Sequence, residues 1–156
     1  MFTQLRQIRN APAARRAGRG TPLLIALLAA AALLLSACSP QQLDSFQRIN
    51  ADRVANGVAA MSIQDALMTK AQQWADYLAS TSHLEHSTLT DSVAPGWAML
   101  GENVGYGPSI ETVESAFMAS PAHRANILNP EFNWAGTGWA VSGNGTVYVV
   151  QVFAKY

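Results

Sequence analysis

The segment at residues 120–128 reads SPAHRANIL, and it fixes the local structure around one of the three histidines of this 156-residue chain. Serine followed by proline is typical of an N-cap and the first residue of a helix, and Asn129-Pro130 supplies the stop. The segment therefore predicts a short helix with His123 in its first turn. Two other stretches, His86-Ser87 and Gly101-Glu102-Asn103, add an imidazole and a carboxylate that can ligate a metal or move protons.

The N-terminal part of the chain differs in composition from the rest. Residues 1–20 carry five arginines and no acid, and residues 21–35 form an apolar run. That run is shorter than the roughly 20 residues that a membrane-spanning helix needs, so it predicts an export signal. The run ends in LSAC at residues 35–38, which resembles a bacterial lipobox. We therefore predict a lipoprotein signal peptide over residues 1–37 and a lipid on Cys38.

Cys38 is the only cysteine of the chain. It could instead be a free thiol, or an ordinary signal peptidase could cut nearby and leave no lipid. Its place at the end of a basic and then apolar leader favours lipidation, and acyl chains would anchor the protein to the bacterial membrane, facing the exterior or the periplasm. Arg15-Arg16 raises twin-arginine export, but general secretion is favoured. Internal disulfides are excluded for lack of a second cysteine.

The chain after the leader is moderately acidic. It keeps five basic residues against all ten acidic ones, a net charge of −5. Nucleic acids require clustered Lys and Arg, so we expect no nucleic-acid partner. The remaining length suits one domain, and we expect a tether over residues 38–42 and a folded domain over residues 43–156.

Apolar spacing predicts three helices before residue 120. The first runs from Leu43 to Gly57, and the third is capped by Ser109. The second begins near Ser62 and ends before His83, with apolar and polar residues on opposite faces: Leu67, Ala71, Trp74 and Leu78 against Lys70, Gln73 and Asp76. In the third helix, we expect Ile110, Val113 and Phe117 to point inward. The spacing of Glu114 from Phe117 predicts that this acid faces solvent.

The C-terminal part predicts a β-hairpin. Residues 134–141 and 146–153 are rich in β-branched and aromatic residues, and Gly143-Asn144-Gly145 supplies the turn. Residues 96–106, around Glu102, give no clear secondary-structure signal. Helices followed by a hairpin indicate an α+β class.

The motifs occur in an order that resembles the CAP superfamily of cysteine-rich secretory, antigen 5 and pathogenesis-related proteins, in its bacterial branch. The resemblance covers residues 43–156. It rests on matching segments in the helices, the loops and the hairpin: Asn50 to Arg53 with Gly57, Ala71, Trp74-Ala75, His86-Ser87, Gly101 to Asn103, Ser120 to Leu128, Gly136 to Gly138 and Tyr148 to Phe153. It implies an α-β-α sandwich around a small antiparallel sheet.

The resemblance also implies a cleft that binds a divalent cation such as zinc. The matching ligands are His86 and His123, and Glu102 is the carboxylate that would orient a histidine or activate a water. Two imidazoles fill half of a tetrahedral zinc shell, so water, substrate or another side chain must complete it. Ser120 stands where many eukaryotic members have a second glutamate.

Each of these residues also has a structural interpretation. Exposed or core histidines are commoner than metal ligands, and Glu102 could fix a loop by accepting backbone hydrogen bonds. Ser120 is most simply an N-cap, which would leave it badly placed as a nucleophile. His83, in the order HLEH at residues 83–86, does not match the His-Glu-x-x-His arrangement of metalloproteases, so we expect it in a loop or at the surface.

Three function classes follow. The preferred one is a lipid-anchored envelope protein whose cleft binds a cation and a small apolar or wall-derived ligand. The second is a metal-dependent or His/Glu-assisted hydrolase of peptide or cell-wall bonds, for which no firm catalytic residue is assigned beyond the candidates His86, Glu102 and His123. The third is a structural or interaction module with a degenerate site. Binding is favoured over catalysis, and the oligomeric state stays open.

Overall fold

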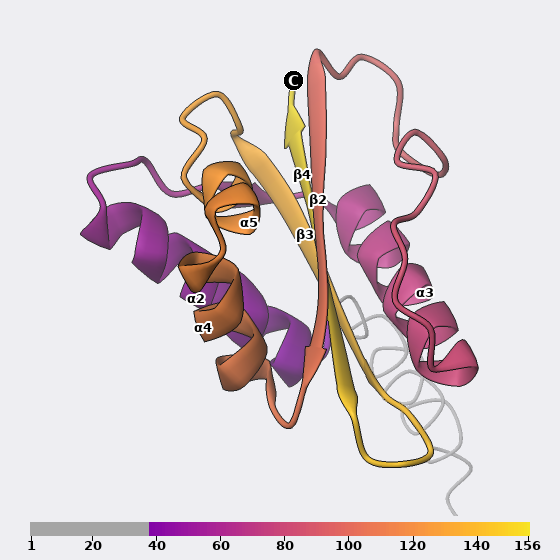
Figure 1. The fold of residues 1–156 in the computed structure, drawn as a ribbon. Helices are drawn as coiled ribbons and strands as arrows, with labels where there is room; N and C mark the ends of the chain where they lie inside the picture. The colour runs from indigo at the N-terminus through magenta and orange to yellow at the C-terminus, as the bar shows by residue number, and fades with distance from the viewer. Residues whose placement is uncertain (1–37) are drawn as a thin grey trace, which may run out of the picture. The chain divides into compact units, whose positions relative to one another are not determined.

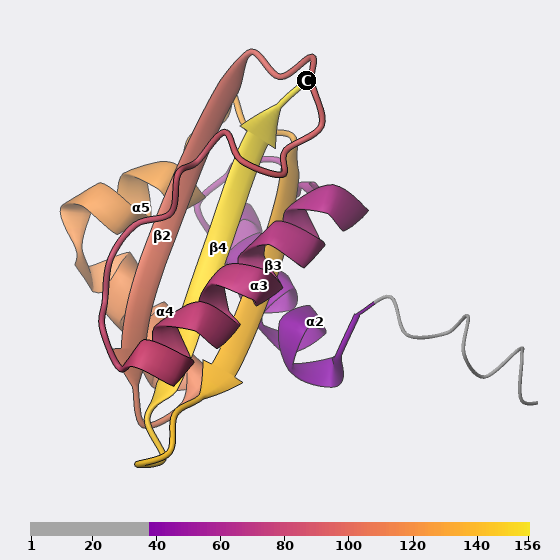
Figure 2. The same ribbon diagram turned by 90° about the vertical axis from the view of Figure 1, so that its right-hand side faces the viewer.

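A computed structural model describes residues 38–156, which form three layers (Figure 1). A sheet of four strands lies in the middle, in the order β1-β3-β4-β2. Helix α3 covers one face, while α2, α4 and α5 cover the other (Figures 1 and 2). The elements are α2 (Pro40–Ala55), β1 (Ser62–Ile63), α3 (Asp65–Thr81), β2 (Met99–Gly107), α4 (Ile110–Ala119), α5 (Pro121–Ile127), β3 (Trp134–Val141) and β4 (Val147–Lys155). The predicted α+β sandwich is confirmed.

The three long strands are antiparallel, as expected for the small sheet, but the short strand β1 pairs with β3 in parallel. Successive side chains of β4 point alternately to the two faces of the sheet. Val149 and Phe153 belong to the apolar core under α2 and α4, whereas Val150 and Val152 belong to the core under α3. This period of two explains why β4 is buried along almost its whole length.

Two glycines allow α3 to lie directly on the sheet. A Cβ atom added to Gly136 would lie 2.1 Å from the backbone of Leu67, and one added to Gly138 would lie 2.2 Å from the backbone of Ala71. Any side chain at these places would push the helix away from β3. Thr137, between them, points to the opposite face and donates its hydroxyl to the backbone oxygen of Gln42.

Helix α2 begins three residues earlier than predicted. Residues 40–42, expected as part of a tether, form its first turn. Ser39 is the N-cap, and its side chain and that of Gln42 each bond the other's backbone N–H in a capping box. Trp139 also donates its indole N–H to the Ser39 hydroxyl. The chain is therefore fixed in place one residue after Cys38.

Helix α3 differs from its prediction in two respects. Ser62 lies in β1 rather than at an N-cap, and the helix starts at Asp65 after Gln64. Lys70, expected on the polar face, is 6% exposed. Its ammonium group donates to the backbone oxygen of Thr88, 2.9 Å away, because the loop after α3 folds back over this side of the helix. Asp76, also predicted on the polar face, is exposed.

Helices α4 and α5 and the hairpin confirm their predictions. Ser109 caps α4 by accepting a hydrogen bond from the Thr112 backbone, and Ser120 is the N-cap residue of α5. The expectation for Glu114 is wrong, because this residue is 3% exposed. It lies four residues after Ile110 and three before Phe117, so it shares their inward face. Within residues 38–156, no helix is both long and apolar enough to cross a membrane.

Candidate functional site

The stretch Gly101-Glu102-Asn103 lies in β2, which forms one edge of the sheet. Its residues point alternately to the two faces. Glu102 pairs with Val152 and contacts the loop after α3, whereas Asn103 pairs with Gln151 and contacts α5. Gly101 faces the α5 side as well, where a Cβ atom would lie 2.9 Å from the Phe132 ring. The stretch thus connects both layers at one edge.

Glu102 holds the loop that carries His86. Its Oε1 accepts from Nδ1 of His86 at 2.8 Å and from the backbone N–H of Ser87 at 2.9 Å. Its Oε2 accepts from the Ser87 hydroxyl at 2.6 Å. Both carboxylate oxygens are therefore occupied, and the side chain of Glu102 is only 3% exposed. Charge-assisted bonds of this kind are about twice as strong as neutral ones.

His86 is held on one side and open on the other. Its side chain is 62% exposed, although its Nδ1 lies against the buried carboxylate. A carboxylate accepts a proton, so the contact selects the neutral tautomer with the proton on Nδ1. The lone pair of Nε2 then faces away from Glu102 and is available to a cation.

His123 lies in the first turn of α5, as predicted, and approaches the edge from the other layer. Asn103 donates from Nδ2 to its backbone oxygen at 3.1 Å, and its ring packs against Phe117 with 4.9 Å between the ring centres. Burial lowers the pKa of His123, and a proton gained by His86 would lower it further. The two imidazoles are thus within electrostatic reach of each other, and His123 tends to be neutral, as a ligand must be.

The side chains around Glu102 do not form a closed metal site within residues 38–156. Within residues 38–156, no three His, Cys, Asp or Glu side chains are grouped closely enough to hold a metal ion. In the same part of the chain, the hydrogen bonds of the Glu102 carboxylate go to His86 and Ser87, and none goes to His123. A cation held by His86 and His123 would therefore need water or a ligand in its remaining positions.

Ser120 has the backbone position predicted for it but not the predicted bond. It is the N-cap residue of α5, yet its side chain makes no capping hydrogen bond. The objection that capping would prevent Ser120 from acting as a nucleophile therefore does not apply. His83 is exposed in the loop after α3, as predicted.

A cleft of about 340 Å³ opens beside His86. Helix α3 supplies one wall and the loop after it supplies the other, and most of the lining side chains are polar or charged: Lys70, Gln73, Trp74, Glu85, His86, Ser87, Thr88, Asp91 and Ser92. Trp74 is the aromatic member. Its indole N–H donates to the Glu85 backbone oxygen, and its ring stacks on Tyr77.

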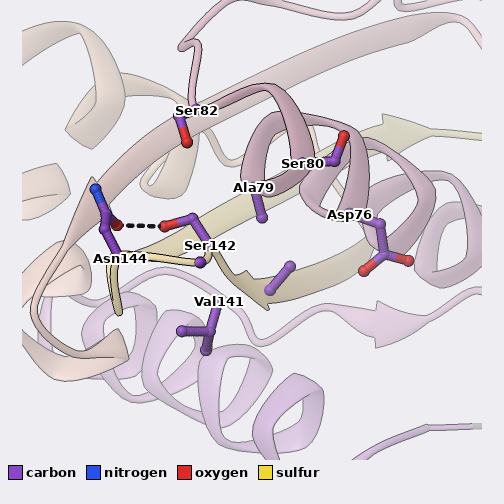
Figure 3. A pocket seen from close by; sticks show the side chains of 9 residues that line it. Asp76, Ala79, Ser80, Ser82, Val141, Ser142 and Asn144 are labelled. Carbon is purple, nitrogen blue, oxygen red and sulfur yellow. Dashed lines mark hydrogen bonds between the residues drawn. The ribbon is translucent and has the colours of Figure 1, made fainter.

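A second hollow, of about 480 Å³, lies between the end of α3 and the hairpin turn (Figure 3). Asp76, Ser80 and Ser82 line it from the helix side. Ser142 and Asn144 line it from the turn, joined by a hydrogen bond of 2.7 Å between their side chains. It contains none of the predicted site residues, so we do not assign it to the site.

Three participants were not identified as such from the sequence. The sequence marks Ser87 only as the neighbour of His86 and indicates no role at the site for Asn103 or Lys70. Alternation along a strand at residues 101–103 would have separated Asn103 from Glu102, but two flanking glycines obscured the strand. The role of Lys70 depends on a loop that no local pattern describes.

An α-β-α sandwich with a carboxylate-held histidine at its sheet edge defines the class of this protein, and comparison with known proteins identifies the family. Residues 46–153 match the model of the CAP, or cysteine-rich secretory protein, family. The chain belongs to that family.

The relatives include bacterial proteins. The uncharacterized protein YkwD of Bacillus subtilis is 29% identical over 115 residues, which cover 68% of this chain and 44% of YkwD, so the chain spans less than half of that relative. An extracellular protein containing an SCP domain from Bacillus anthracis has a TM-score of 0.61 at 19% identity, over 74% of this chain and 40% of the other. NaASP2, solved with Zn²⁺, has a TM-score of 0.59 at 13% identity, over 76% and 82%. These two structures share the fold.

Proposed function

We propose that this chain is an exported, lipid-anchored CAP protein of the bacterial envelope whose cleft binds a divalent cation and a small wall-derived ligand. The observation that carries the cation proposal is the 2.8 Å contact between Nδ1 of His86 and buried Glu102, on an imidazole that is 62% exposed. A histidine that ligates a metal usually donates its other ring N–H to a carboxylate or similar acceptor, which fixes the ring orientation and the tautomer. The Zn²⁺ in NaASP2, a protein of this fold, supports the same proposal.

The lining of the cleft beside His86 favours a polar ligand over an apolar one. Lys70, Glu85 and Asp91 are charged, and Trp74 is the aromatic residue among nine lining residues. Specific pockets for apolar ligands are lined mainly by apolar side chains with a few polar ones. A fragment of cell wall, with hydroxyl, amide and carboxyl groups, matches this lining better than a lipid does.

The cation proposal is tested by calorimetric titration of the domain with zinc. We expect one binding step in the wild type, and its loss or a weakening of at least about tenfold in His86→Ala and in His123→Ala. His83→Ala is the matched control, because His83 is an exposed histidine three residues from His86 and should bind zinc as the wild type does.

Unchanged zinc binding in both site variants would exclude His86 and His123 as ligands. Absence of a binding step in the wild type would favour the third class, a structural module whose polar cluster serves the fold. The hydrolase alternative needs a free general base, and Glu102 is poorly suited because both its oxygens already accept hydrogen bonds.

A further inference from the structure

A row of buried polar side chains crosses the sheet on the face covered by α2, α4 and α5. Thr137, Gln151 and Asn103 lie at the same register level of β3, β4 and β2. Each of them is 0% exposed. Buried polar groups destabilise a fold unless they are hydrogen-bonded, so the partners of this row determine what it does.

The hydrogen bonds of Gln151 and Asn103 form a chain with a single direction. Asn126 donates from Nδ2 to Oδ1 of Asn103 at 2.9 Å, and Asn103 donates from Nδ2 to Oε1 of Gln151 at 2.8 Å. Gln151 then donates from Nε2 to Oε2 of Glu114 at 2.5 Å. Ser45 donates its hydroxyl to Oε1 of Glu114 from α2, also at 2.5 Å. The donors on both sides thus converge on Glu114.

The direction of this chain depends on the carboxylate at its end. An amide can present either its oxygen or its NH₂ group to a neighbour, whereas an ionised carboxylate only accepts. Glu114 therefore requires Gln151 to turn its NH₂ group toward α4, which leaves the amide oxygen of Gln151 for Asn103. Asn103 must then present Nδ2, and the same nitrogen donates to the backbone oxygen of His123 at 3.1 Å.

We propose that Glu114 is a positioning residue for His123, acting through the amides of Gln151 and Asn103. Glu114 belongs to α4 and touches neither His123 nor the cleft beside His86. It holds the first turn of α5 at the sheet edge by fixing which end of each amide faces which neighbour. The inference rests on the proposed function only where cation affinity is the readout.

Protonation of Glu114 changes the hydrogen bonds at this end of the chain of amides without any mutation. Burial raises its pKa to about 7, against the opposing effect of the bonds from Ser45 and Gln151. The charges that act on it come from α2, where Asp52 raises the pKa and Arg48 lowers it. The strands contribute neutral Gln151 and Asn103. The carboxyl group therefore gains or loses its proton near neutral pH, and the hydrogen bonds of Gln151 and Asn103 should respond.

Three variants separate positioning from stability. Glu114→Leu removes the acceptor, whereas Glu114→Gln keeps one, since its amide oxygen can accept from Gln151 while its NH₂ group donates to Ser45. Val113→Ala destabilises the same helix at a neighbouring buried position, outside the chain of hydrogen bonds. The readouts are the side-chain amide NMR signals of Asn103, the ring signals of His123, and zinc affinity by calorimetry.

We expect Glu114→Leu to shift the Asn103 and His123 signals and to weaken zinc binding about tenfold, the lower end of the effect of groups behind metal ligands. Glu114→Gln and Val113→Ala should keep wild-type His123 signals. Wild-type His123 signals in folded Glu114→Leu would overturn the proposal. So would equal shifts in Val113→Ala, because loss of stability would then explain them.

A titration of the wild type covers the case in which Glu114→Leu does not fold. Between about pH 5 and pH 8, the Asn103 amide signal should follow the titration of the Glu114 carboxyl group, and it should not do so in Glu114→Gln. An Asn103 signal that ignores Glu114 would overturn the proposal. Absence of zinc binding in the wild type would contradict the proposed cation site, while the NMR measurements would still decide the role of Glu114.

Discussion

Glu102 and Glu114 are both buried carboxylates, and their hydrogen-bond partners differ. Glu102 accepts from His86 and from two groups of Ser87, so its charge is stabilised by three donors. Glu114 accepts from two neutral side chains, those of Ser45 and Gln151. Two bonds do not offset the burial of Glu114, and its pKa is raised to about 7. At this scale the two acids have separate tasks, one fixing a loop and one titrating near neutrality.

The raised pKa of Glu114 predicts a dependence of stability on pH. The folded state binds this proton more tightly than the unfolded state, whose pKa is near 4.5. The stabilisation that the bound proton gives to the folded state is fully present below about pH 4.5 and is lost as the pH rises through about 7. The shift corresponds to about 3 kcal/mol in the free energy of unfolding. Urea denaturation at pH 5 and pH 8 should show this loss in the wild type and a much smaller one in Glu114→Gln.

Glu111→Gln is the control for that comparison, because Glu111 is an exposed acid on the same helix. It should show the wild-type pH dependence. Identical profiles for the wild type and Glu114→Gln would mean that Glu114 stays ionised in the folded state throughout this range.

Glu114 also shows where reasoning from local spacing alone fails. The apolar pattern of α4 located its inward face correctly at Val113 and Phe117, and the spacing of Glu114 puts it on that face. The expectation of a solvent-facing side chain came from the spacing of Glu114 from Phe117, but a separation of three residues puts both side chains on one face of a helix. Charged residues are rarely buried unless paired, and the partners of Glu114 come from α2 and β4, far away in the sequence. No local pattern reveals such partners.

Among the elements, the contact between α3 and β3 depends most on single residues. Gly138→Ala would put a Cβ atom 2.2 Å from the backbone of Ala71, where no flexible side chain can move aside. The helix would have to shift from the strand, and overpacking of a core costs about 3 kcal/mol or more when the backbone must move. Chemical denaturation should show a loss of this size.

Gly143→Ala is the matched control. Gly143 lies in the hairpin turn, and a Cβ atom added to it meets nothing within 4 Å. Its stability should stay within about 0.5 kcal/mol of the wild type, as for most surface changes. Equal losses of stability in the two variants would contradict this explanation, because Gly143 has no contact with α3 that a Cβ atom could disturb.

Elements with local signals were predictable from the sequence, and elements without them were not. The cap at Ser109, the Ser120-Pro121 pair and the turn at residues 143–145 are local signals that predicted α4, α5 and the hairpin, because such signals act within a few residues. Strand β2 has no clear local signal in the sequence. Its glycines reduce any strand propensity, and it forms because β4 pairs with it along its whole length. The site was accordingly predicted as a set of residues but not as an arrangement.

For the whole domain, the edge position of β2 explains how distant segments meet. Helix α3 lies on one face of the sheet and α5 on the other (Figure 2); His86 lies in the loop after α3, and His123 lies in the first turn of α5. In the middle of a sheet, the strands separate the segments that pack on its two faces. At an edge strand, segments from both faces can approach the same residues. Glu102 and Asn103, consecutive in β2, each hold one of the two histidines. The site therefore depends on the packing of both layers.

The proposed lipid anchor is the last property that belongs to the whole protein. Cys38 directly precedes Ser39, which is tied to Gln42 and Trp139, so a lipid on Cys38 would hold the folded domain close to the bilayer without a flexible tether. In Cys38→Ser, expressed as the full chain in bacteria, we expect the protein to leave the membrane fraction while thermal unfolding of the domain stays unchanged, because acyl chains supply the membrane affinity. Ser39→Ala keeps the cysteine and removes the cap, so it should stay with the membrane and lose about 1 kcal/mol of stability. A mature wild-type protein whose Cys38 carries no mass beyond that of the free residue, by mass spectrometry, would rule out lipidation as the anchor.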